Sequence, residues 1–100
     1  MIIYNVTINV DDDIHIQWLE WMQKVHIPEV LTTGLFTGYR LCRLLDVDDE
    51  GTTYSVQYSC KSLDDYKMYK ATHAPRLQQE TFKKFGEKFM AFRTLLEVIE

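Results

Sequence analysis

Apolar and polar side chains alternate along much of the chain with a period of two residues. Between residues 2 and 10 every even-numbered residue is apolar, and Asn5, Thr7 and Asn9 stand at odd-numbered positions. Because successive side chains of a strand point to opposite faces of a sheet, this period predicts a strand with one apolar and one polar face. Similar alternation, or enrichment in Leu, Tyr and Val, predicts strands over residues 2–10, 36–47, 52–60 and 89–99, with a hairpin turn at the acidic stretch DVDDEG, residues 46–51.

Two other segments carry apolar residues at helical spacing. The apolar face of the first consists of Ile14, Trp18, Trp21, Met22 and Val25. Pro28 lacks an amide hydrogen and disfavours helix at the residue before it, so we expect this helix to stop or bend there, with a short turn continuing to Gly34. The second segment runs from a capping residue, Ser62, to Gly86, and its interruption at residues 74–75 predicts one kinked helix or two in tandem.

The resulting order of elements is strand, helix, strand, strand, helix, strand, which is the βαββαβ arrangement called ferredoxin-like. Right-handed crossovers place both helices on one face of a four-stranded antiparallel sheet, with the first and third strands central. We therefore expect an α+β fold that forms a single domain over residues 1–100. The other face has no cover, and because apolar side chains on it favour burial, we expect a homodimer that packs two such faces together.

The uncovered face of the sheet is the first candidate ligand site. Two guanidiniums and an amide on one face could hold a carboxylate or a phosphate through charge-assisted hydrogen bonds. Alternatively, the arginines pair with Glu97 or with acidic residues of the second subunit across the dimer interface. The side chains expected on this face are Asn5, Thr7, Arg43, Gln57 and Arg93, with apolar patches at Leu41, Leu45 and Leu95.

The composition of this face depends on the register of two strands, because a one-residue slip exchanges their faces. In the second strand we expect Cys42 and Leu44 to point inward, since this keeps the charge of Arg43 out of the core. In the last strand we expect Phe92 and Leu96 to point inward. The aromatic residues of the sheet would then face the helices and could not stack on RNA bases.

The histidines are candidates for proton transfer. His26, at the end of the first helix, could point into the cleft between the helix corner and the sheet and move protons near neutral pH. It could equally contact the helix C-terminal carbonyls in a structural role, and His73, beside the second interruption, raises the same choice. His26 and Glu29 lie on either side of Pro28 and lack the spacing of a zinc pair, so we expect no metal site and no cofactor.

Charge and composition narrow the possible partners. The net charge of -4 and the isoelectric point near 5.3 argue against nucleic acid, which requires clustered Lys and Arg. No apolar run approaches the roughly 18 residues of a membrane span, and the alternating start MIIYNVTINV differs from a signal peptide. We therefore expect a cytoplasmic protein with no membrane partner. Cys42 and Cys60 lie in separate strands and form no C-x-x-C pair, so we expect free thiols.

Several stretches resemble known families. The helix corner WLEWMQKVHIPEVL and the segment YKATHAPRL, with the order of elements, resemble the dimeric α/β barrel superfamily. Its members include cofactor-free monooxygenases, haem-degrading enzymes, muconolactone isomerases, sugar mutarotases and ligand-sensing domains. More closely, the whole chain resembles the bacterial domain of unknown function 4286 family, through MIIYNVT, W-L-x-W-M with HIPEVL, T-T-Y-S-V-Q-Y, A-P-R-L and F-G-x-K-F-x-A-F-R-T-x-L-E. This resemblance implies a ferredoxin-like fold and a dimer, and it supplies no catalytic residues.

Three functions are open at this point. The leading hypothesis is a homodimer that binds a small polar or anionic metabolite between sheet and helices, either as a binding module or as an enzyme of unassigned reaction. The second is a cofactor-free oxygenase or isomerase in which His26 or His73 is the acid or base. The third is a protein-interaction dimer without a ligand pocket, because one fold can serve unrelated functions.

Overall fold

The computed structural model describes residues 1–48 and 50–100. Its four strands form one antiparallel sheet in the order β2-β3-β1-β4, which confirms the predicted ferredoxin-like arrangement with the first and third strands central. The predicted turn over residues 46–51 includes Asp49, which lies outside the described residues. The elements in chain order are β1 (Ile2–Val10), α1 (His15–Trp21), η1 (Met22–His26), α2 (Ile27–Thr32), β2 (Gly38–Arg43), β3 (Thr52–Cys60), α3 (Leu63–Thr72), α4 (Ala74–Phe85) and β4 (Phe89–Glu97).

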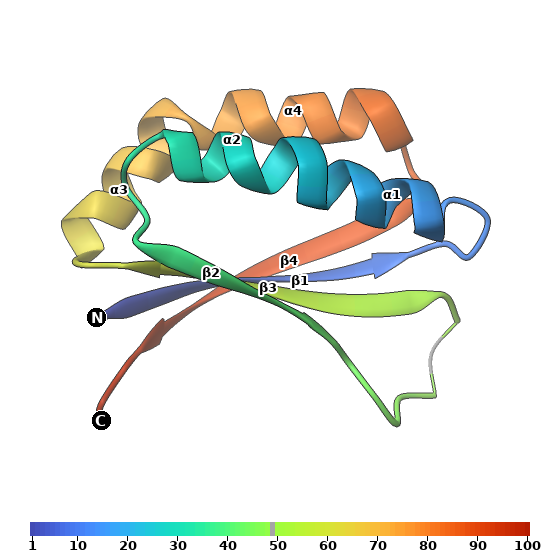
Figure 1. The fold of residues 1–100 in the computed structure, drawn as a ribbon, viewed down its shortest axis with the longest axis horizontal. Helices are drawn as coiled ribbons and strands as arrows, with labels where there is room; N and C mark the ends of the chain where they lie inside the picture. Colours follow the sequence, from blue (N-terminus) through green and yellow to red (C-terminus); the bar gives the residue numbers. More distant parts are fainter. Residues whose placement is uncertain (49) are drawn as a thin grey trace.

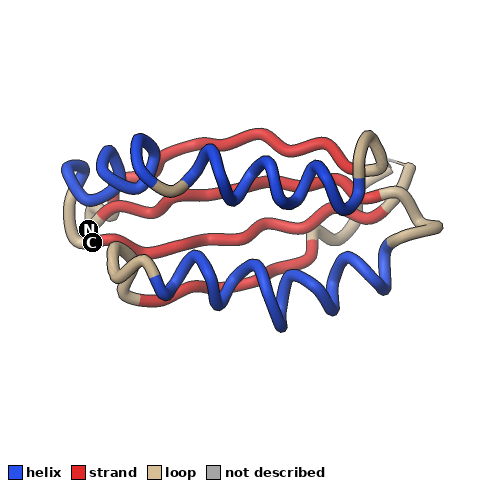
Figure 2. Tube along the Cα trace, turned by 90° about the horizontal axis from the view of Figure 1, so that it is seen from above, coloured by secondary structure: helices blue, strands red, loops and turns tan. Residues whose placement is uncertain are grey.

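All the helices lie on one face of the sheet, and the other face is uncovered (Figure 1). From above, α1, η1 and α2 form one row of helix, and α3 and α4 form a second row beside it (Figure 2). The core fills the layer between these rows and the sheet, where the apolar residues of β1 and β3 meet those of the helices. Each fully buried side chain of this kind stabilises the fold by roughly 1.5–3 kcal/mol. The helices contribute Trp18, Ile27, Val30 and Leu77, none more than 1% exposed.

The chain remains helical through the segment before Pro28. Met22–His26 form a turn of π-helix, in which the amide of Ile27 donates to the carbonyl of Met22, five residues earlier. Pro28 cannot donate to a carbonyl four residues earlier, and a wider turn gives its ring room. Instead of the expected stop or bend, the helix continues past Pro28 with one extra residue in a single turn. As a result Val25 is exposed, and Ile27 takes the next core position.

The second row consists of two helices in tandem, one of the two predicted alternatives. Ser62 caps α3, its side chain accepting a hydrogen bond from the Asp65 amide at 3.2 Å. Pro75 lies in the first turn of α4, where a missing amide hydrogen costs no helical hydrogen bond. Gly86 ends α4 with a φ of +61°, a conformation that glycine adopts without strain.

The register of β2 is opposite to the prediction. Arg43 pairs with Tyr54 and therefore lies on the helix-covered face, whereas Cys42 pairs with Ser55 on the open face. Leu41 also lies on the covered face and packs against the core. The prediction rested on the cost of burying the charge of Arg43, but Arg43 ends an edge strand and is exposed. Because its charge remains in water, that cost does not arise.

The register of β4 is also opposite to the prediction. Arg93 pairs with Val6 on the covered face, and Phe92 pairs with Thr7 on the open face. Leu96 likewise lies on the open face. A period of two could not settle this register because both alternating sets are largely apolar. The covered set includes Phe89, Ala91 and Leu95, and the open set includes Met90, Phe92 and Leu96.

The open face combines a polar centre with an apolar edge. Asn5, Thr7 and Gln57 lie there as predicted. At the centre, Asn5 accepts a hydrogen bond from the Ser55 hydroxyl at 2.6 Å and donates to Thr94 at 3.2 Å. The edge strand β4 adds exposed apolar side chains, namely Met90, Phe92 and Leu96.

Candidate functional site

A cavity of about 50 Å³ lies between the sheet and the two helical rows. Its walls combine apolar side chains of the core with an unusual number of polar ones, contributed by both helical rows and by three strands. The polar members of the lining are Tyr4, Trp18, His26, Tyr58, Tyr69, Gln78, Thr81 and Arg93. A cavity with this many hydrogen-bonding groups is suited to a polar ligand or to ordered water.

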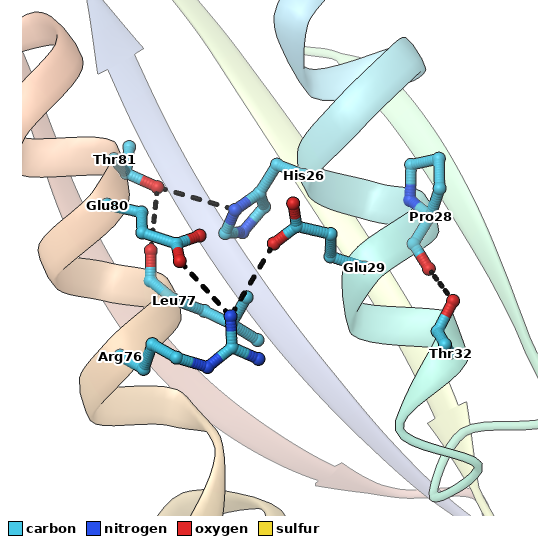
Figure 3. A network of polar contacts seen from close by, with 8 residues as sticks. All are labelled: His26, Pro28, Glu29, Thr32, Arg76, Leu77, Glu80 and Thr81. Atoms are coloured by element: carbon cyan, nitrogen blue, oxygen red, sulfur yellow. Dashed lines mark hydrogen bonds and ion pairs between the residues drawn. The ribbon is translucent and has the colours of Figure 1, made fainter.

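His26 reaches the cavity from the π-helical turn. Its Nδ1 lies 3.4 Å from the Thr81 hydroxyl on α4 (Figure 3). The centre of its ring lies 5.3 Å from that of Trp21. Burial lowers the pKa of His26 to about 4; the negative charge of Glu80 acts in the opposite direction, and Arg93 adds to the lowering. The imidazole is therefore neutral at pH 7, with one nitrogen able to accept a proton or a hydrogen bond.

Arg93 supplies the positive charge of the cavity. Among the described residues, no carboxylate forms an ion pair with its guanidinium. Burial raises the pKa of Tyr4, and the nearby charge of Arg93 partly offsets this rise. An arginine without a carboxylate partner beside a cavity can bind an anion through two parallel hydrogen bonds.

Three further side chains place hydrogen-bond donors around the cavity, and one of them, the indole of Trp18, is unpaired among the described residues. Burial raises the pKa of Tyr58 and of Tyr69, so both phenols stay protonated at neutral pH. Trp18 is fully buried, and its indole Nε1–H has no hydrogen-bond partner among the described residues. An unpaired buried N–H costs about 1–3 kcal/mol, which a hydrogen-bond acceptor in the cavity would recover.

A network of charges lies between the two helical rows, next to His26. Arg76 on α4 is 3.1 Å from Glu80 on the same helix and 3.8 Å from Glu29 on α2 (Figure 3). The pKa of Glu29 is raised, by its partial burial first and by the charge of Glu80 second. All three side chains are about half exposed, so this network contributes little to stability, typically under about 1 kcal/mol per pair.

The structure brings together only two of the residues that sequence analysis selected, His26 and Arg93. Arg93 reaches the cavity because its strand has the opposite register to the one expected. Arg43 stands at the edge of the sheet and does not line the cavity. His73 lies between α3 and α4, with its ring 6.3 Å from that of Tyr69, and it is not part of the cavity wall.

The polar open-face residues belong to a different surface. Asn5, Thr7 and Gln57 lie on the side of the sheet away from the cavity. Sequence reasoning missed the tyrosines and Trp18, since it assigned the aromatic residues to the core, and it did not select Gln78 or Thr81. One signal could have identified part of the site, because phenols placed on an apolar face need hydrogen-bond partners.

The described residues contain no group of three His, Cys, Asp or Glu side chains placed to hold a metal ion. Cys42 and Cys60 are free thiols. Among the helices in the described part of the chain, none is both long and apolar enough to cross a membrane.

Comparisons with known proteins identify a matching family and solved structures with a similar fold. A family model described as "Domain of unknown function (DUF4286)" matches residues 1–99. The structure is similar to that of a dimeric ferredoxin-like protein from an uncultured marine organism, with a TM-score of 0.71, 12% identity, and coverage of 99% of this chain and 95% of that chain. No curated protein matches the sequence.

Two other solved structures are similar to this one over nearly their whole length. One is a candidate antibiotic biosynthesis monooxygenase from Nitrosomonas europaea, with a TM-score of 0.68, 13% identity and coverage of 100% of both chains. The other is a hydroxynitrile lyase from Passiflora edulis, with a TM-score of 0.64, 11% identity, and coverage of 99% of this chain and 96% of that chain. At these identities the likeness concerns the fold alone.

Proposed function

Because the chain belongs to the DUF4286 family, whose description assigns no activity, we propose a function from the cavity itself. The protein is a cytoplasmic homodimer in which each subunit binds a small polar or anionic metabolite between the sheet and the helices. The main support for this proposal is the lining of the cavity. Arg93 lines it and has no ion-pair partner among the described residues. The neutral His26 and the unpaired indole N–H of Trp18 line it as well.

The chemistry of the lining favours an anion over a cation or an apolar molecule. The guanidinium of Arg93, the indole of Trp18 and the phenols of Tyr58 and Tyr69 can all donate hydrogen bonds. No carboxylate lines the cavity among the described residues, so a cationic ligand would lack a counter-charge. A carboxylate would meet both the charge of Arg93 and the unpaired indole N–H of Trp18.

The proposed dimer joins the open faces of two sheets. Three observations support it: Phe92 is 64% exposed and Met90 is 75% exposed on this face, and a structural neighbour is described as dimeric. Apolar side chains on one sheet face are a common basis for a two-fold interface, in which the same patch serves both subunits. The polar centre formed by Asn5, Ser55 and Thr94 would lie in the same interface.

Native mass spectrometry of the protein purified gently from its own host tests both parts of this proposal. One chain has a mass of 11.9 kDa, and we expect a dimer of twice that mass that retains a small molecule. The adduct should be lost in Arg93→Gln and kept in the matched control Arg43→Gln, which changes an exposed arginine at the sheet edge. A monomeric mass would contradict the dimer, and an adduct that survives Arg93→Gln would contradict the site.

A second candidate is a cofactor-free enzyme that uses His26 as a base. Its support is the neutral imidazole at the cavity wall, together with structural neighbours described as a monooxygenase candidate and a lyase. A neutral histidine can take a proton from a bound substrate, and an adjacent guanidinium can stabilise the negative charge that develops. On this hypothesis His26→Ala preserves the fold and abolishes turnover, whereas His73→Ala preserves both.

The third hypothesis, an interaction dimer without a ligand pocket, has less support because a polar-lined cavity is present. A dimer that carries no adduct after gentle purification would favour it over the proposed function.

A further inference from the structure

We propose that the cavity accepts a short-chain 2-hydroxycarboxylate, whose carboxylate binds Arg93 and whose hydroxyl donates a hydrogen bond to Nε2 of His26. This inference rests on the proposed function, because it specifies the ligand of the same cavity. It follows from three observations: the size of the cavity, the tautomer of His26 that Thr81 selects, and the balance of donors and acceptors in the lining.

The size of the cavity limits the ligand to a few atoms. The space is about 50 Å³, and a water molecule needs roughly 10–15 Å³ by this measure, so about four waters fit. A carboxylate with a chain of two or three carbons and one more polar group displaces about that number of waters.

Thr81 determines which nitrogen of His26 carries the hydrogen. The hydroxyl of Thr81 has one hydrogen, and it donates this hydrogen to the carbonyl of Leu77, one turn earlier in α4, at 3.1 Å (Figure 3). Toward Nδ1 of His26, at 3.4 Å, the same oxygen can therefore only accept. We assign the Nδ1–H tautomer to the neutral imidazole, which leaves Nε2 as a hydrogen-bond acceptor.

The remaining lining is rich in donors. Arg93 and the indole of Trp18 can only donate, and the phenols of Tyr58 and Tyr69 can donate as well. These donors suit the oxygen atoms of a carboxylate. His26 Nε2 can only accept, so it requires a ligand group that carries a hydrogen, whereas Gln78 offers both an acceptor oxygen and donor hydrogens.

One ligand class meets both requirements within this size. A 2-hydroxycarboxylate presents an anion and, one carbon away, an O–H. A 2-oxocarboxylate has the same size and charge, but it would place a carbonyl oxygen against the lone pair of Nε2. A plain carboxylate leaves Nε2 without a partner, and a site built to hydrogen-bond a hydroxyl discriminates against a ligand that lacks it.

Calorimetric titration with three acids of equal chain length tests this inference: 2-hydroxypropanoate, 2-oxopropanoate and propanoate. We expect 2-hydroxypropanoate to bind about 3–10-fold more tightly than propanoate, since one hydrogen bond separates them, and 2-oxopropanoate to bind most weakly. In Arg93→Gln all three should bind much more weakly. Equal binding of all three acids would overturn the assignment to a hydroxy acid, but its loss in Arg93→Gln would leave the proposed anion site intact. Binding of none of the three would overturn the ligand class, and the host-purified adduct then decides separately whether the proposed function stands.

The role of Thr81 as a positioning residue has its own test without any ligand. Long-range proton–nitrogen NMR of the labelled protein should show a hydrogen on Nδ1 of His26 and none on Nε2. Thr81→Val removes the acceptor and should change the tautomer ratio and reduce the preference for the hydroxy acid. Thr81→Ser keeps the hydroxyl and should restore both. A hydrogen on Nε2 in the unaltered protein would overturn the inference.

Discussion

The polar groups on the two faces of the sheet differ in whether they have hydrogen-bond or ion-pair partners. On the open face, Asn5 bonds to Ser55 and Thr94, so the polar side chains satisfy one another. On the covered face, the indole N–H of Trp18 is left without a partner, and Arg93 has no ion pair among the described residues. Satisfied groups gain little from a ligand, whereas a buried unpaired group such as the Trp18 N–H gains more, and Arg93 adds a positive charge with no competing carboxylate among the described residues. The comparison therefore supports the proposals that the covered face recognises a small molecule and that the open face associates with a second subunit.

The largest effect should come from placing a charge on each face in turn. Val56 is fully buried on the covered face, and its neighbour Gln57 lies on the open face. We expect Val56→Asp to unfold the protein, with a loss above about 4 kcal/mol, because an unpaired carboxylate cannot be buried. Gln57→Asp should cost no more than about 1 kcal/mol in the subunit. Chemical denaturation measures both, and similar losses would mean that the faces do not differ as described.

The buried histidine should make the covered face sensitive to acid. His26 has a pKa of about 4 in the folded protein, against about 6.5 when unfolded. Between these values the unfolded chain binds the extra proton, so the free energy of unfolding falls as the pH falls from about 6.5 to 4, by up to about 3 kcal/mol. Urea denaturation across this range should show the loss, and His26→Gln should remove it.

A matched histidine variant serves as the control for this acid effect. His73→Gln changes a half-buried histidine outside the cavity, and its stability should follow the same pH dependence as the unaltered protein. If His26→Gln and the unaltered protein had parallel curves, burial of a neutral imidazole would be contradicted.

The smallest of the three effects concerns association. Phe92 on the open face and Phe82 on α4 are similarly exposed, at 64% and 57%. Phe92→Arg should weaken the dimer by about 2 kcal/mol or more, because it removes an apolar contact and brings two like charges together across the two-fold axis. Phe82→Arg should leave the assembly unchanged. Light scattering over a dilution series compares the two variants, and an equal effect would place the interface elsewhere.

The sequence was informative where a strand has one largely apolar and one largely polar face. This holds for β1 and β3, whose faces were predicted correctly from the alternation that places Asn5 and Gln57 opposite the core. It fails for the edge strands, where both faces carry apolar residues. For the second strand the prediction then relied on the cost of burying Arg43, and for the last strand on placing Phe92 and Leu96 inward. Arg43 and Arg93 are both exposed in edge strands, so a burial cost could not select either register.

The wrong register of the last strand also explains why only part of the candidate site was predicted. His26 stood out because Pro28 follows it closely, and it does line the cavity. Arg93 was selected for its charge but placed on the wrong side of the sheet. Trp18 was assigned to the core, which is correct, but its unpaired N–H depends on the positions of neighbouring atoms that no spacing in the sequence specifies.

The π-helical turn has a consequence for insertions and deletions. It holds one residue more than the corresponding α-helical turn, and the core residues on either side, Met22 and Ile27, are five positions apart instead of the usual four. Loss of one exposed residue there, such as Gln23, would restore ordinary helical spacing and keep both flanking segments in phase with the core. The wall of the cavity would change while the fold remained. A deletion of one residue would therefore alter the candidate site without altering the architecture.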